Sequence, residues 1–77
     1  MSQRSCVFRD AVRAEVKLAQ ENHAPQTSLH EGLSVLWEEF EEVKQEVFKK
    51  HPDREALRKE LVQVAAMAER MAEDNGL

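Results

Sequence analysis

The chain has 77 residues, of which 34% are charged, and its net charge is -4. A chain of this length forms one small domain, taken here as residues 1–77, whose single core rarely contributes more than about 3–5 kcal/mol. The charges are interleaved without a basic block, which excludes the cationic face that a DNA or RNA binder needs, and no apolar run approaches the roughly 20 residues of a membrane helix.

The single cysteine, Cys6, has no partner for a disulfide within the chain, and no Cys/His spacing suggests structural zinc. Small domains without such staples commonly gain stability by oligomerisation. We therefore expect self-association. No apolar stretch of signal-peptide length follows the first residues, so we expect a cytoplasmic protein in which Cys6 stays reduced.

The first predicted helix covers about residues 5–22 and ends before the turn residues around Pro25. Its apolar residues form two adjacent stripes, which together make a wide apolar face. The helix either occupies a groove of a bundle or contacts both its own chain and a second subunit. The two stripes are Val7, Ala11, Ala14 and Leu18, and Phe8, Val12, Val16 and Ala19.

The second predicted helix covers about residues 29–50. Ser28 and Glu31 fit a capping box, in which the N-cap Ser and the Glu three residues later satisfy each other's free backbone amides. The apolar residues that follow are spaced alternately by four and three, which is a seam of period about 3.5. This seam consists of Leu29, Leu33, Leu36, Phe40, Val43 and Val47.

The third predicted helix covers about residues 53–74, with Pro52 and Asp53 at its start. The short connection from the second helix predicts an antiparallel hairpin. No strand pattern occurs, so the expected fold is all-α, with three helices and a core of four-helix-bundle type completed by oligomerisation. The apolar seam of this helix consists of Leu57, Leu61, Val64, Ala68 and Met71.

A dense acidic run lies in the middle of the second helix. Glu38, Glu39, Glu42 and Glu46 fall within an arc of about 100° on a helical wheel. The run is either a solvated acidic face or a site for a hard cation such as Mg²⁺, which prefers oxygen ligands. Glu60 lies on the flank of the third helix that faces the second, where an acid can complete such a site.

Two segments, residues 30–43 and residues 57–68, resemble the all-α nucleoside triphosphate pyrophosphohydrolases, the MazG-like superfamily. That family carries an EExxE motif on one helix and an ExxD motif on the next. The first motif matches the run from Glu38 to Glu42, and the second begins at Glu60. The resemblance covers about residues 28–74, which is most of the chain.

The resemblance implies a specific activity and a specific site. Members split the bond between the α and β phosphates of a nucleoside triphosphate, releasing a monophosphate and pyrophosphate. They hold Mg²⁺ with carboxylates of both motifs, and they assemble as dimers or tetramers. Carried over to this chain, Glu39, Glu42 and Glu60 would bind the metal, and Glu38 would act in catalysis as a ligand or a water-orienting neighbour.

The chain departs from the family pattern at Gln63, which stands where the second motif has aspartate. A glutamine oxygen can coordinate a cation, so Gln63 stays among the predicted metal ligands, although it brings no charge. The departure leaves an alternative open, namely a non-catalytic MazG-like module for oligomerisation or interaction. A plain coiled-coil adaptor is a weaker alternative, because each seam spans only about three heptads.

Basic residues that could contact the substrate phosphates are not evident after the second motif. Arg9, Arg13 and Lys17 of the first helix are candidates for this role, from the same or another subunit. The other reading of these three residues is a solvated basic face.

Overall fold

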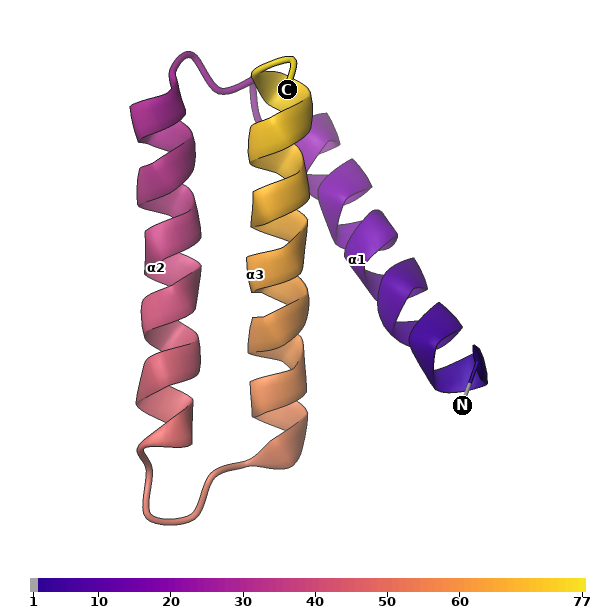
Figure 1. Ribbon diagram of the computed structural model, residues 1–77, viewed down its shortest axis with the longest axis vertical. Helices are drawn as coiled ribbons and strands as arrows, with labels where there is room; N and C mark the ends of the chain where they lie inside the picture. Colours follow the sequence, from indigo (N-terminus) through magenta and orange to yellow (C-terminus); the bar gives the residue numbers. More distant parts are fainter. Residues whose placement is uncertain (1) are drawn as a thin grey trace.

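The computed structural model describes residues 2–77, with side chains from residue 7 onwards. The regular secondary structure of this part of the chain is α-helix alone, with no strand: α1 (Ser2–Asn22), α2 (Leu29–Val47) and α3 (Arg54–Asp74) follow one another (Figure 1). The prediction of an all-α chain with three helices is confirmed. The prediction that Cys6 stays reduced concerns a side chain that the structure does not describe.

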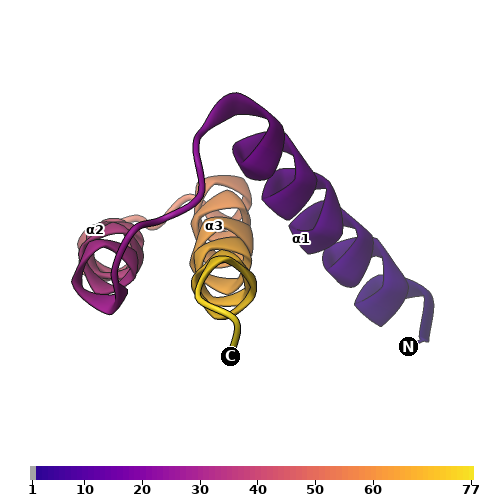
Figure 2. The same cartoon turned by 90° about the horizontal axis from the view of Figure 1, so that it is seen from above.

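The three helices are arranged around α3. α2 and α3 lie side by side and antiparallel, which confirms the predicted hairpin (Figure 1). α1 lies on the other side of α3 and diverges from it towards its own N-terminus (Figure 2). Within the described residues α1 packs only on α3 and has no backbone-level contact with α2. α1 and α2 are therefore joined through α3 and through the loop between them.

The ends of the helices differ slightly from the predicted ones. α1 begins at Ser2 rather than at residue 5, and α2 ends at Val47 rather than at residue 50. The early end of α2 follows from the buried side chain of Glu46, which accepts hydrogen bonds from the Asp53 backbone N–H (2.9 Å) and the Lys49 ammonium (2.8 Å). These bonds hold residues 48–53 in a tight connection, so a further helical turn does not form.

The predicted capping box is present in part, and Asp53, predicted in the first turn of the third helix, is instead its N-cap. Ser28 caps α2, because its hydroxyl accepts a hydrogen bond from the Glu31 N–H at 3.1 Å. Glu31 does not reach back to Ser28 but accepts from the Thr27 N–H at 3.3 Å, so the capping box is half formed. Asp53 caps α3 by accepting from the backbone of Glu55 at 2.9 Å. Each cap satisfies amides that a helix start leaves without partners.

The buried core lies between α1 and α3. One of the two stripes predicted on the first helix, that of Phe8, Val12, Val16 and Ala19, packs there. In the other stripe Leu18 stays 51% exposed. The core is small and made largely of small side chains, so it leaves much apolar surface outside. Its buried members are Val12, Val16, Val62, Ala66 and Met67.

Most of the apolar seam predicted for the second helix stays exposed, although Leu36 is half-buried against the core. The buried residues of α2 are Gly32 and Glu46. Gly32 allows close approach to α3, since a Cβ there would lie 2.6 Å from the Met71 Cγ. The seam consequently points to one side of the hairpin, where Phe40 is 57% exposed. We call this side the apolar face; it comprises Leu33, Leu36, Trp37 and Phe40 of α2 with Val64 of α3.

In the part of the chain that the structure describes, no helix has the length and apolar character needed to cross a membrane.

Candidate cation site

Three predicted site residues meet between α2 and α3. Glu39 and Glu42 lie one turn apart on α2, and Glu60 lies opposite them on α3. One carboxylate oxygen of each lies within 4.8 Å of an oxygen of the other two. The antiparallel hairpin causes this meeting, because it sets the middle of α2 beside the first half of α3. We call these three residues the acidic cluster.

Glu60 is the most strongly perturbed member of the acidic cluster. The neighbouring Glu42 carboxylate, which hydrogen-bonds to the protonated form, and burial together raise the pKa of Glu60 to about 7. Its Oε2 atom is buried and has no hydrogen-bond partner among the described residues. Because an ionised carboxylate can only accept hydrogen bonds, Glu60 needs a proton, a cation or a further hydrogen-bond donor at this position.

Glu39 is perturbed in the same direction. Burial of the half-buried carboxylate is the largest cause of its raised pKa, followed by the charge of Glu42 and a hydrogen bond with it. Glu38 and Glu15 add smaller repulsions. Among residues 7–77 no lysine or arginine forms an ion pair with any member of the acidic cluster. The cluster is therefore a concentration of negative charge without a compensating side chain.

The donor set of the cluster suits a hard divalent cation. Carboxylate oxygens are the ligands that Mg²⁺ and Ca²⁺ prefer. Two oxygens that share one Mg²⁺ ion lie no more than about 4.2 Å apart, since each bond is about 2.1 Å. The oxygens of Glu39, Glu42 and Glu60 lie within 4.8 Å of one another, so small side-chain rotations would let the three residues hold one ion. An ion would also satisfy the buried Oε2 atom of Glu60.

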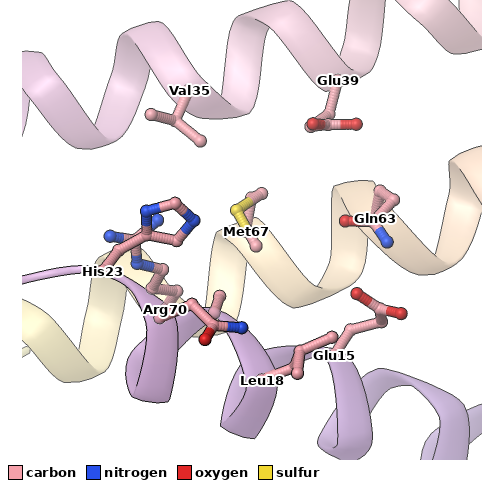
Figure 3. A pocket seen from close by; sticks show the side chains of 10 residues that line it. Glu15, Leu18, His23, Val35, Glu39, Gln63, Met67 and Arg70 are labelled. Atoms are coloured by element: carbon pink, nitrogen blue, oxygen red, sulfur yellow. The ribbon is translucent and has the colours of Figure 1, made fainter.

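A pocket of about 420 Å³ lies beside the acidic cluster, between all three helices (Figure 3). Glu39 and Gln63 belong to its wall at the cluster end, and His23 and Arg70 to its wall at the other end. Gln63 therefore lies next to the cluster, as the motif spacing predicts, and presents its amide to the pocket. The remaining lining residues are Glu15, Leu18, Ala19, Asn22, Val35 and Met67.

A buried polar network forms the far end of the pocket. Arg70 forms an ion pair with Asp74 at 3.3 Å, and both side chains are less than a tenth exposed. Arg70 also donates to the Ala24 carbonyl at 3.3 Å, and Asp74 accepts from the Gln26 N–H at 3.1 Å. The network fastens the connection between α1 and α2 to the end of α3, and so it fixes the position of α1 relative to the acidic cluster.

The other sequence-predicted candidates lie elsewhere. Glu38 is exposed beside Glu39 and is not part of the acidic cluster. Arg13 forms ion pairs with Glu69 and Glu73 of α3, and Arg9 and Lys17 are exposed. Arg13 is thus held in ion pairs at the surface between α1 and α3 and does not point to the acidic cluster.

Sequence reasoning missed Glu15, the α1 carboxylate that lines the pocket. A signal for it was present, because Glu15 interrupts the apolar spacing of α1, three residues after Val12 and four before Ala19. A charged residue between the apolar positions of a helix lies at the edge of the buried face, where it can line a pocket. The buried roles of Arg70 and Glu46 were also missed, since a charged residue is by default assigned to the surface.

Comparisons with known proteins return no match to this chain, whether with family models, with curated proteins or with solved structures.

Proposed function

We propose that this chain is a Mg²⁺-dependent nucleoside triphosphate pyrophosphohydrolase, which cleaves an NTP or dNTP to the monophosphate and pyrophosphate. The observation that carries the proposal is the meeting of Glu39, Glu42 and Glu60 in one cluster. These are the positions at which the resemblance to the MazG-like superfamily implies metal ligands. The adjacent pocket of about 420 Å³ adds support, because it offers room for a nucleoside beside the cluster.

Each acidic residue has a role in the proposed reaction. Glu39, Glu42 and Glu60 would hold Mg²⁺, which when bound neutralises phosphate charge and lowers the pKa of water. Hydrolysis adds one water across the bond between the α and β phosphates. Glu38, exposed beside Glu39, would orient that water and accept its proton. Gln63 would offer a neutral oxygen to the ion or to the substrate.

Self-association is part of the same proposal. The apolar face leaves Trp37 60% and Leu33 47% exposed on one side of the hairpin. Contiguous apolar surface of this kind typically marks a protein–protein interface. We propose that two copies pair through it and complete a bundle of four helices, two from each copy. The acidic cluster then lies on the opposite flank of each hairpin, towards α1.

A pyrophosphate-release assay tests the activity. The chain is incubated with Mg²⁺ and each common NTP and dNTP, and pyrophosphate is measured separately from orthophosphate. We expect pyrophosphate from at least one substrate, and we expect Glu39→Gln and Glu42→Gln to lower turnover at least about a hundredfold. Glu21→Gln is the matched control, because Glu21 is an exposed residue of α1 that lines neither the pocket nor the apolar groove. Absence of pyrophosphate across the whole panel would exclude the proposal.

The second candidate function is a non-catalytic module for oligomerisation or interaction. The extent of the exposed apolar face favours it, and so does the neutral Gln63 where the family motif has an acid. This candidate predicts a stable oligomer with no turnover and no change of melting temperature on addition of Mg²⁺ and nucleotide. A stabilisation by these ligands would argue against it, since only binding to the native state raises stability.

A further inference from the structure

The pocket of about 420 Å³ between the three helices changes in character from one end to the other. Glu39 and Gln63 lie at one end, and His23 and Arg70 lie together at the opposite end (Figure 3). Met67 lies between the two ends, where the wall is apolar. A molecule that fills the pocket therefore meets an acid and an amide at one end, an apolar middle, and nitrogen donors at the other end. The remaining apolar lining residues are Leu18, Ala19 and Val35.

Arg70 is held in a fixed orientation at its end of the pocket. Its side chain is 9% exposed, and Nε donates to the Asp74 carboxylate at 3.3 Å. Nη2 donates to the Ala24 carbonyl, also at 3.3 Å. These two bonds come from different nitrogens and go to different segments, so they fix the plane of the guanidinium. An arginine fixed in this way is pre-organised to bind a planar group that carries acceptor atoms.

The two bonds leave several donors of Arg70 free. A guanidinium carries five N–H donors. Within residues 7–77, Nε–H and one N–H of Nη2 are used, so the second N–H of Nη2 and both N–H groups of Nη1 make no hydrogen bond there. Nη1 is not among the fully buried atoms that lack a partner, and Arg70 lines the pocket. The free donors of this buried side chain are therefore open to the pocket.

The charge at this end of the pocket is balanced, which decides what kind of group it suits. Asp74 neutralises Arg70, and both side chains are less than a tenth exposed. A phosphate there would add negative charge beside a buried carboxylate, whereas a neutral acceptor would not. Asn22 and His23, adjacent in the chain, also line the pocket and offer further polar groups. Together with the apolar middle, these features suit the flat ring and acceptor-rich edge of a nucleobase.

We propose that this end of the pocket binds the nucleobase of the substrate, and that Arg70 is a specificity-determining residue that selects guanine. Guanine presents two adjacent acceptors, O6 and N7, on one edge, and arginine donates to both in the commonest specific contact with a base. Adenine and cytosine present an amino group on that edge, and thymine presents a single acceptor. This inference rests on the proposed function and names its substrate as GTP or dGTP, with the phosphates towards Glu39.

Binding of nucleosides in the absence of Mg²⁺ tests the inference, because a nucleoside carries no phosphate and does not need the acidic cluster. Guanosine, inosine, adenosine and 7-deazaguanosine are each titrated into the full wild-type chain, and the backbone amide signals are followed by NMR. We expect guanosine and inosine, which share O6 and N7, to shift the signals of His23 and Arg70. Adenosine should bind on the order of tenfold more weakly, and so should 7-deazaguanosine, in which a C–H group replaces N7.

Arg70→Lys separates recognition from packing. Lysine keeps a positive charge beside Asp74 but loses the planar pair of donors, so the preference for guanosine over adenosine should fall severalfold. Arg13→Lys is the matched control, because Arg13 also forms an ion pair but does not line the pocket, and it should keep the preference. The same spectra show whether each variant is folded. If Arg70→Lys does not fold, the comparison of guanosine with 7-deazaguanosine on wild type still decides the question.

The possible results separate this inference from the proposed function. If wild type releases pyrophosphate with equal kcat/KM for GTP and ATP, or if guanosine and 7-deazaguanosine bind alike, the assignment of guanine is wrong while the activity stands. Shifts that gather at Glu39 and Gln63 instead of at His23 and Arg70 would also overturn the assignment, and so would the absence of any shift. If guanosine binds as expected but no triphosphate is cleaved, the pocket recognises guanine and the proposed activity is wrong.

Discussion

Glu42 of α2 and Glu60 of α3 place their carboxylates against each other across the hairpin, and within residues 7–77 neither has a cationic partner. The contact is the largest cause of the raised pKa of Glu60, about 7. A pair of carboxylates this close cannot ionise fully without a cation, so at lower pH the two share a proton. Proton and metal therefore compete for the same position.

The first prediction concerns the stability of the metal-free chain. Between pH 4.5 and about 7 the folded chain retains a proton at Glu60 that the unfolded chain releases. The unfolded state thus binds fewer protons, and stability falls as the pH rises through this window. We expect the melting temperature in the presence of a chelator to be lower at pH 8 than at pH 5. The difference should be roughly 4–8 °C for each 1 kcal/mol by which the free energy of unfolding falls.

Glu60→Gln should remove most of this pH dependence, because the amide does not titrate. The control is Glu21→Gln, which should retain it, since Glu21 is exposed on α1. Melting curves followed by circular dichroism provide the measurement. A Glu60→Gln chain whose melting temperature varies with pH as wild type does would show that the dependence originates elsewhere.

The second prediction concerns Gln63. Replacing Gln63 by Asp adds a negative charge beside Glu39 and the pocket. We expect Mg²⁺ to bind on the order of tenfold more tightly, and we expect the metal-free chain to be less stable because the added charge increases repulsion. Calorimetric titration and thermal melting measure the two effects. Gln45→Asp at an exposed position of α2 is the control. An equal gain in Mg²⁺ affinity in this variant would mean that the affinity depends only on the net charge of the chain.

Both predictions depend on residues that the sequence pattern had identified, and the reason is local. The spacing of Glu39 and Glu42 places them on one turn whatever the tertiary structure is. The short connection around Pro52 then forces an antiparallel hairpin, which brings Glu60 opposite them. Short-range geometry thus determined most of the cluster, and the same holds for the Ser28 and Asp53 caps.

The features that the sequence left open or did not reveal depend on information that one sequence does not contain. A seam of period about 3.5 indicates that an apolar stripe needs a partner, but it does not say whether the partner is in the same chain. The structure turns Gly32 and Glu46 of α2 towards α3 and leaves Phe40 largely exposed. Glu15 and Arg70 were missed for a related reason, since their burial follows from how α1 and α3 cross.

The third prediction tests the apolar face. Leu33 is 47% exposed there and lines the apolar groove with Trp37 and Phe40. If this face pairs two copies, Leu33→Glu buries an unpaired charge in the interface and should shift the chain to monomers in sedimentation equilibrium. Leu77→Glu, the same change at an exposed residue outside the face, should leave the assembly intact. An unchanged oligomer in Leu33→Glu would place the interface elsewhere.

A monomer of this size can be too unstable to study, so a second measurement accompanies the third prediction. If folding and pairing are coupled, the melting temperature of the wild-type chain rises with protein concentration. A melting temperature independent of concentration, together with a monomeric mass, would contradict the proposed interface without any variant.

The fourth prediction concerns the buried pair of Arg70 and Asp74. Their side chains are 9% and 8% exposed, and Asp74 also accepts the Gln26 N–H. Arg70→Met keeps the length of the side chain but leaves the Asp74 charge buried without a cation, which typically costs about 3–5 kcal/mol. Arg13→Met is the matched control, because Arg13 also forms ion pairs but is 69% exposed. Its loss should cost no more than about 1 kcal/mol.

Urea unfolding of both variants measures this difference, and Mg²⁺ binding of the folded fraction adds a second readout. Because the pair fastens the loop between α1 and α2 through Ala24 and Gln26, Arg70→Met should also loosen α1, which forms one wall of the pocket beside the acidic cluster. Mg²⁺ affinity should then fall. If Arg70→Met lowers stability but leaves Mg²⁺ affinity unchanged, the position of α1 has no influence on the ion, and the link between the two ends of the pocket is absent.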